Sequence, residues 1–194
     1  MNQVTSYLEN INLIPDLVNG LVKNINKVSE EIINCYKNDG KVVVFGNGGS
    51  ASQAEHFAVE LVVKIKDMRK SLPAISLNSN CAILSAIGND FDFNYVFERQ
   101  VESCVINGDV VIGISTSGKS KNVIEAINEA NRLEGITVGL TGNDSCELAK
   151  IVKYPIVVKN KYKELDTQII QDVHQIMLHY IALKVDEEFK NGAY

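Results

Sequence analysis

The hydrophobic positions near the start of the chain follow a helical period. Between Pro15 and Tyr36 apolar side chains recur every three or four residues, a spacing that places them on one face of a helix. The positions that define this face are Leu17, Leu21, Ile25, Val28 and Ile32. Asn38, Asp39 and Gly40 end the pattern, so the sequence predicts a long amphipathic helix that stops at a turn.

Farther along, short apolar runs alternate with helical patterns. Residues 41–45 are dominated by Val and Phe, as is typical of a strand buried on both faces of a parallel sheet. Further strands are expected at 74–77, 110–114, 137–140 and 156–158. Helices are expected near 51–66, 81–88, 93–105, 120–133, 145–151 and 165–189. This alternation predicts one α/β domain over 1–194, with a doubly wound parallel sheet and an N-terminal helical region at 1–38.

Composition and charge narrow the class of protein. The 194 residues are 45% hydrophobic with only three prolines, which excludes a disordered or collagen-like chain and a small disulfide-dependent scaffold. The net charge of -5 carries no long block of one sign, so nucleic-acid binding by bulk phosphate neutralisation is not expected. The four cysteines form no Cys-x-x-Cys pair, and neither a leader peptide nor a membrane span is expected. We therefore expect a cytoplasmic protein.

Open α/β sheets bind ligands beyond the carboxyl ends of their strands, so segments that leave a strand and open a helix carry the candidate chemistry. The first such segment, 46–52, reads Gly-Asn-Gly-Gly-Ser-Ala-Ser. Its glycines let backbone N–H groups approach an anion, and Ser50 is expected to cap the following helix. Ala51 stands where a dinucleotide fingerprint has its third glycine, and no Gly-Lys-Ser/Thr follows, so a Walker loop is excluded.

The second segment, 115–120, reads Ser-Thr-Ser-Gly-Lys-Ser and contains four hydroxyls at the start of a predicted helix. A helix needs a single hydroxyl as its N-cap, so a simple capped turn leaves the other hydroxyls unexplained. Hydroxyls together with helix N-terminal N–H groups bind a phosphate monoester well. We therefore favour a phosphate site over a capped turn.

All three histidines lie near candidate chemistry. His56 and Glu60 share one face of the helix after the glycine segment and can hold one metal or one substrate, although an exposed surface pair is the plainer alternative. On the last predicted helix, His174 and His179 point about 140° apart, so they are not expected to share a ligand. His174 is expected to support packing instead.

Taken together, these segments resemble the phosphoheptose isomerases of the sugar isomerase (SIS) family. The motifs that carry the resemblance are 46–50, 56–61, 72–75, 86–91 and 113–120, with Gln171, His174 and His179. The resemblance implies a five-stranded, flavodoxin-like SIS domain that isomerises sedoheptulose 7-phosphate to D-glycero-D-manno-heptose 7-phosphate for heptose biosynthesis. It also implies a homotetramer with active sites between subunits.

The resemblance further implies a role for each matching site residue. The residues that would bind the sugar are Asn47, Gly48, Gly49, Asn89 and Asp90. Those that would bind the phosphate are Ser115, Thr116, Ser117 and Ser120, with help from Ser50. A zinc ion would be held by His56, Glu60, Gln171 and His179. Glu60 and His179 would also transfer protons, and Gln171 would touch the substrate.

The residue types agree with these roles, because aldose–ketose isomerisation needs one base and one acid and imidazole titrates near neutrality. Gln171 and His179 lie about 12 Å apart along one helix, so we expect a neighbouring subunit to supply one of them. Lys64 and Ile169 stand where the family pattern usually has arginines, which leaves a different sugar phosphate open. A non-catalytic SIS module that binds protein is the other alternative, disfavoured by the retained Glu60 and His179.

Overall fold

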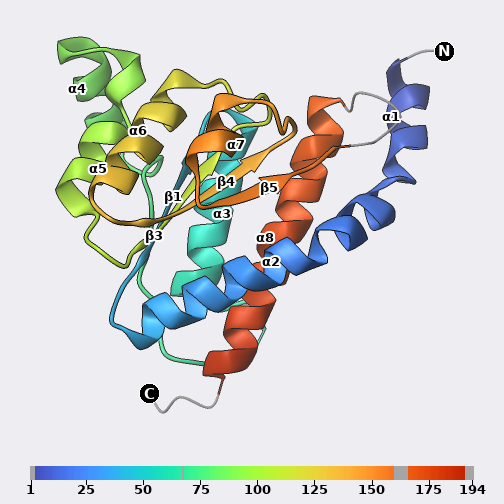
Figure 1. Ribbon diagram of the computed structural model, residues 1–194, viewed down its shortest axis with the longest axis horizontal. Helices are drawn as coiled ribbons and strands as arrows, with labels where there is room; N and C mark the ends of the chain where they lie inside the picture. Colours follow the sequence, from blue (N-terminus) through green and yellow to red (C-terminus); the bar gives the residue numbers. More distant parts are fainter. Residues whose placement is uncertain (1–2, 67, 160–165, 191–194) are drawn as a thin grey trace.

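A five-stranded parallel sheet lies between two layers of helices (Figure 1). The computed structural model describes residues 3–66, 68–159 and 166–190. The strands are β1 (Val42–Gly46), β2 (Ala74–Ser76), β3 (Val110–Ile114), β4 (Ile136–Thr141) and β5 (Tyr154–Val157). Their order, β2-β1-β3-β4-β5, confirms the predicted doubly wound, flavodoxin-like sheet.

All residues of β1 and β3 are buried, so helices cover both faces of the sheet. The helices are α1 (Gln3–Ile11), α2 (Ile14–Lys37), α3 (Gly49–Val62), α4 (Cys81–Asp90), α5 (Glu98–Cys104), α6 (Lys121–Arg132), α7 (Glu147–Ile151) and α8 (Thr167–Phe189), with a 3-10 turn at Phe93–Tyr95. One hydrophobic core joins α2, α3 and α8 to the sheet. A second core packs α4, α5, α6 and α7 against the other face of the sheet. None of the described helices is long and apolar enough to cross a membrane.

Several element boundaries differ from the prediction. The separate helix α1 was not expected, and α3 ends at Val62 instead of continuing to 66. The predicted helix 93–105 is broken because Phe97 turns into the second core and stacks on Phe45 at 5.1 Å between ring centroids. β5 begins at Tyr154 and includes Pro155, which an edge strand tolerates. Residue 165, the predicted start of the last helix, lies outside the described residues.

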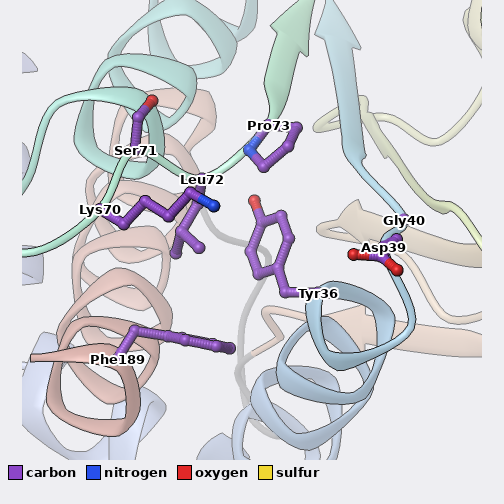
Figure 2. A pocket seen from close by; sticks show the side chains of 8 residues that line it. All are labelled: Tyr36, Asp39, Gly40, Lys70, Ser71, Leu72, Pro73 and Phe189. Carbon is purple, nitrogen blue, oxygen red and sulfur yellow. The ribbon is translucent and has the colours of Figure 1, made fainter. Parts of the chain in front are cut away.

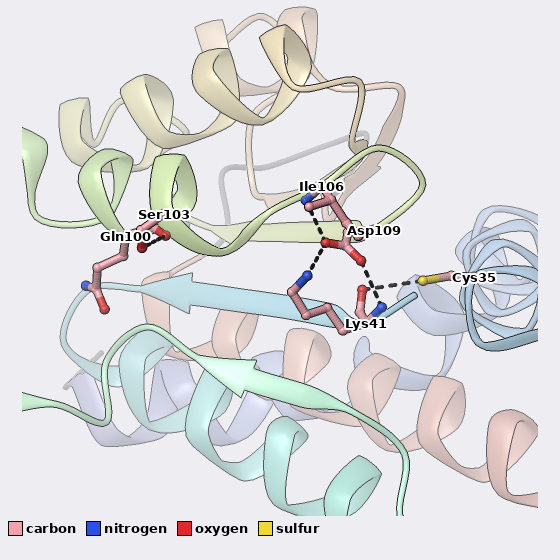
Figure 3. Close-up of polar contacts among 6 residues, drawn as sticks. All are labelled: Cys35, Lys41, Gln100, Ser103, Ile106 and Asp109. Carbon is pink, nitrogen blue, oxygen red and sulfur yellow. Dashed lines mark hydrogen bonds and ion pairs between the residues drawn. The ribbon is translucent and has the colours of Figure 1, made fainter. Parts of the chain in front are cut away.

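A buried carboxylate fixes the amino ends of the two central strands (Figure 3). Asp109 is fully buried and accepts hydrogen bonds from the backbone N–H groups of Lys41 and Ile106, and it also pairs with the Lys41 ammonium. At the other end of the same strands, Gly46 of β1 is in register with Ile114 of β3. The two candidate segments therefore leave neighbouring strands at the same edge of the sheet.

Candidate active site

The glycine segment and the hydroxyl segment are joined by a reciprocal pair of amides. The Nδ2 of Asn47 donates to the Oδ1 of Asn122 at 2.8 Å, and the Nδ2 of Asn122 donates back at 2.9 Å. Asn122 is almost fully buried in the first turn of α6, and its Oδ1 also accepts from the Val123 N–H. The pair therefore holds the two segments at a fixed spacing where the sheet reverses strand order, which is the usual ligand position in this fold.

The hydroxyl segment forms a tight loop before α6. The Oγ atoms of Ser115 and Ser120 lie 3.0 Å apart, and Ser115 Oγ accepts from the Gly118 N–H. Ser120 occupies the N-cap position of α6, yet its side chain makes no capping hydrogen bond. Because the Ser120 side chain does not cap α6, the amino end of this helix is open to an anion held by the loop.

Gly118 gives the hydroxyl loop its shape. Its φ of +65° lies in the left-handed region, and a Cβ atom there would lie 2.1 Å from the Sγ of Cys146. A side chain at this position would therefore meet both backbone strain and a steric clash.

The expectation that Ser50 caps the helix after the glycine segment is wrong. Gly48, with φ of +56°, is the N-cap residue of α3, and no side chain caps this end. Ser50 lies inside the first turn and is 3% exposed, because it packs against Gly46, where a Cβ would come within 2.8 Å of the Ser50 Cβ. The tight packing of strand and helix decides the position of Ser50.

Three of the predicted site residues form a compact cluster between α3 and α8. The Nδ1 of His179 lies 2.6 Å from Oε1 of Glu60, and the Nε2 of His56 lies 3.3 Å from the same oxygen. The rings of His56 and His179 meet edge to face at 5.1 Å. The potential ligand atoms of all three residues lie within 4.8 Å of one another. The interpretation of His56 and Glu60 as an unrelated surface pair therefore loses its support.

Burial and a neighbouring amide orient this cluster. Glu60 is 7% exposed, whereas the His56 side chain is about half exposed, so the cluster opens to solvent on the His56 side. The Nε2 of His179 lies 3.1 Å from the amide nitrogen of Gln175. Because a carboxylate oxygen only accepts, Nδ1 of His179 carries the proton that is donated to Glu60, and Gln175 holds the other side of the ring.

Gln171 lies apart from this cluster within one chain. Its amide covers Gly49, where a Cβ atom would lie 2.6 Å from Gln171 Nε2, and its backbone carbonyl accepts from Gln53 at 2.7 Å. Gly49 precedes His56 by seven residues, or about 10 Å along α3. Within the chain, Gln171 therefore borders the glycine segment, where it faces a substrate more readily than the histidines.

The other predicted sugar contacts lie elsewhere. Asn89 and Asp90 are exposed at the end of α4 and bond to each other at 2.8 Å. That helix packs in the second core, on the sheet face opposite α3 and α8 (Figure 1). The structure thus brings Glu60 and His179 together between α3 and α8, pairs Asn47 with Asn122 of α6, and leaves Asn89 and Asp90 on α4 in the second helix layer.

The structure also places three further residues that the sequence singled out. Ile169, which stands where the family pattern usually has an arginine, is fully buried in the first core. Lys64 is exposed just beyond the end of α3. His174 is also fully buried, as its packing role required, and burial lowers its pKa to about 4, with the backbone of Thr141 opposing the shift.

Sequence reasoning missed the residues that hold the site in place. Asn122, Gln53 and Gln175 orient site groups through amide hydrogen bonds, and Arg69 bonds to the backbone of Glu60. Each partner lies far away in the sequence or depends on a side-chain rotamer. An asparagine in the first turn of the helix after the hydroxyl segment was the one available signal.

A cavity of about 330 Å³ lies at the opposite end of the sheet, beside Gly40 and Pro73, which precede β1 and β2 (Figure 2). Tyr36, Lys70 and Phe189 contribute to its wall. Burial raises the pKa of the Tyr36 hydroxyl. Since this fold binds ligands at the carboxyl ends of its strands, we do not assign this cavity to the phosphorylated substrate.

The comparison with known proteins supports the fold and the two candidate segments. The model of the SIS domain family matches residues 6–142. This match covers more than half of the chain, including the glycine segment, the hydroxyl segment and Glu60. The chain therefore belongs to the SIS-domain family.

Within that family the chain belongs with the phosphoheptose isomerases. Phosphoheptose isomerase 1 of Campylobacter jejuni is 44% identical over 165 residues, which cover 85% of this chain and 87% of that protein. The phosphoheptose isomerase of Aliarcobacter butzleri is 37% identical over 188 residues, 97% of each chain. The solved structure of a phosphoheptose isomerase from Francisella tularensis matches with a TM-score of 0.87 at 30% identity, covering 95% of this chain and 97% of that one.

Proposed function

We propose that this protein interconverts sedoheptulose 7-phosphate and D-glycero-D-manno-heptose 7-phosphate, a step toward activated heptose for lipopolysaccharide or capsule. The observation that carries the proposal is the 2.6 Å contact between Glu60 and His179, in a chain that is a member of the phosphoheptose isomerases. A buried carboxylate beside an imidazole is the acid–base pair that an enediol mechanism needs. The same contact disfavours a non-catalytic, protein-binding SIS module.

Substrate binding follows from the two loops. The hydroxyls of Ser115, Thr116, Ser117 and Ser120 hold the phosphate at the α6 N-terminus, where the helix dipole favours negative charge. Asn47, Gly48 and Gly49 line the path from the phosphate to the sugar carbons, and Ser50 supports this loop from behind. Gln171 covers Gly49 and contacts the sugar chain from the α8 side. We assign Asn89 and Asp90 to the sugar through contacts made across a subunit interface.

Proton transfer uses Glu60 and His179. Glu60 removes a proton from C1 of the ketose, while His179 gives a proton to the oxygen on C2, and the enediol results. In the second half, Glu60 returns its proton to C2, while the imidazole takes the proton of the C1 hydroxyl and the aldehyde forms. The low exposure of Glu60 limits exchange of the carried proton with water.

The same cluster fits a zinc ion, so we propose one Zn²⁺ per subunit. Oε2 of Glu60 is buried and has no hydrogen-bond partner within the described part of the chain, as expected of an oxygen reserved for a ligand. Two imidazoles and a carboxylate are a usual donor set for zinc. When bound, the ion supplies Lewis-acid stabilisation of negative charge on a substrate oxygen. His56, Glu60 and His179 would hold it, and Gln171 of a neighbouring subunit would complete the set.

We further propose a homotetramer in the cytoplasm, with active sites between subunits. Val59, Val62, Val63 and Ile75 expose apolar surface around a groove of about 490 Å³ beside α3, which supports contact with another copy. The separation of Gln171 from His179 also favours a zinc ligand that is supplied by a neighbouring subunit. Four free thiols agree with a reducing compartment.

A substrate series tests this proposal. Purified, zinc-loaded protein is assayed with phosphorylated ketoses of five, six and seven carbons, and Glu60→Gln serves as the inactive control. We expect the highest kcat/KM for sedoheptulose 7-phosphate. Because Lys64 replaces the usual arginine, a preference for a shorter sugar is the second candidate and would discard the heptose assignment. Absence of turnover on the whole series would refute the isomerase proposal.

A further inference from the structure

We propose that Arg69 is a positioning residue for the reaction, an inference that rests on the proposed isomerase function. Its guanidinium ties the end of α3, which carries Glu60, to α8, which carries His179, and so sets the spacing of the proton-transfer pair. The Arg69 side chain is fully buried at the end of α3, whereas the glycine segment lies at the start of that helix.

The link begins at the last turn of α3. A helix leaves its final carbonyl groups without intrahelical donors, and they need other partners when buried. The carbonyl of Leu61 accepts from the Leu72 N–H at 3.3 Å, and the carbonyl of Glu60 accepts from Nη2 of Arg69 at 2.8 Å. Arg69 therefore caps α3 at the residue whose carboxylate acts on the substrate, and its positive charge complements the negative end of the helix dipole.

The link continues to α8 through a buried ion pair. Nε of Arg69 donates to Oδ1 of Asp186 at 2.7 Å, and the two side chains are 0% and 2% exposed. Asp186 follows His179 on α8 by seven residues, or about 10 Å along the helix. Oδ2 of Asp186 also accepts from the Lys66 N–H at 3.3 Å, so the carboxylate holds the chain after α3 at two points. α3 and α8 run in the same direction here, since Gln53 meets Gln171 and Glu60 meets His179.

A guanidinium is suited to this task because its donors are fixed in one plane. Nη1 of Arg69 donates to the Lys70 carbonyl at 3.0 Å, so one rigid group reaches α3, α8 and the connecting chain together. A lysine ammonium has a single nitrogen and cannot span the same separated partners. Because a displacement of about 1 Å in a reacting pair can cost about 100-fold in rate, loss of this link is expected to affect turnover before substrate binding.

Arg69→Lys and Asp186→Asn test the inference, with Asp109→Asn as the matched control. Asp109 is equally buried and paired with Lys41, but the hydrogen bonds of its carboxylate run to Lys41 and Ile106 and not to α3 or α8 (Figure 3). We expect Arg69→Lys and Asp186→Asn to lower kcat at least tenfold while KM changes less than about threefold. Asp186→Glu, which keeps the charge, should recover part of the loss. Asp109→Asn should leave kcat of the folded protein within about twofold of wild type.

A second readout does not depend on turnover. In zinc-free protein labelled with ¹⁵N-histidine, the proton on His179 Nδ1 reports its hydrogen bond to Glu60. This signal should shift in Arg69→Lys and Asp186→Asn and stay in place in Asp109→Asn. If kcat and the His179 signal of the first two variants match those of the control, the inference is wrong. If wild type isomerises no sugar phosphate, the proposed function fails, while the His179 signal still decides whether Arg69 positions the pair.

Discussion

Burial of His174 should make the stability of this protein depend on pH in a defined window. His174 is fully buried on α8, and burial lowers its pKa from 6.5 to about 4. The unfolded chain keeps an ordinary histidine, so between these values the unfolded state binds the proton and the folded state does not. The stabilisation that comes with a neutral His174 is therefore complete above about pH 6.5 and is lost as the pH falls toward 4.

The size of the effect follows from the shift. One pKa unit corresponds to about 1.4 kcal/mol, so the whole shift is worth about 3 kcal/mol in the free energy of unfolding. Between pH 7 and pH 5 the expected loss is about 2 kcal/mol. This is a large part of the roughly 5–15 kcal/mol that holds a typical domain folded.

Urea unfolding of wild type and His174→Leu isolates the contribution of His174 to the free energy of unfolding. Both proteins are measured at pH 7, 6 and 5, at one protomer concentration and without zinc. Other groups titrate in both proteins and cancel in the difference. We expect the stability of wild type relative to His174→Leu to fall by about 2 kcal/mol from pH 7 to pH 5. Met177→Leu, a buried change without a titrating group on the same helix, should show a constant difference from wild type. A constant difference for His174→Leu as well would refute the reasoning.

Other variants probe the proposed site. Glu60→Gln and His179→Ala should each lower kcat by about 10²–10⁴-fold, with sugar-phosphate binding by calorimetry largely kept; near-normal turnover of Glu60→Gln would contradict the proton-transfer scheme. Ser117→Ala should raise KM for the phosphorylated sugar several-fold with a smaller effect on kcat, and an unchanged KM would remove Ser117 from the phosphate site. Gly118→Ala should lower the free energy of unfolding by about 2 kcal/mol or more and weaken phosphate binding, because its Cβ would clash with Cys146. For Gly118→Ala, thermal unfolding measures the stability and calorimetry with inorganic phosphate measures the binding. Wild-type values in both measurements would contradict the predicted clash.

The fold followed from local patterns that one sequence displays. Unbroken apolar runs such as 110–114 predicted strands buried on both faces, and the structure has that strand with the same bounds. The predicted helical region at 1–38 forms two helices, α1 and α2, and the break between them was not predicted. The break before α5 could not be read from the sequence, because it depends on the contact of Phe97 with Phe45 of a distant strand.

The site was determined by the sequence only as far as residue types and motif spacing reach. The hydroxyl segment, the glycine segment and the pair His56 and Glu60 are local, since a strand exit and a helical spacing of four place them without reference to the rest of the chain. The approach of His179 to Glu60 was decided by tertiary structure, because the two residues are 119 positions apart in the sequence. The same holds for Arg69 and Asp186, whose ion pair forms only after α3 and α8 pack together and exclude water from both charges.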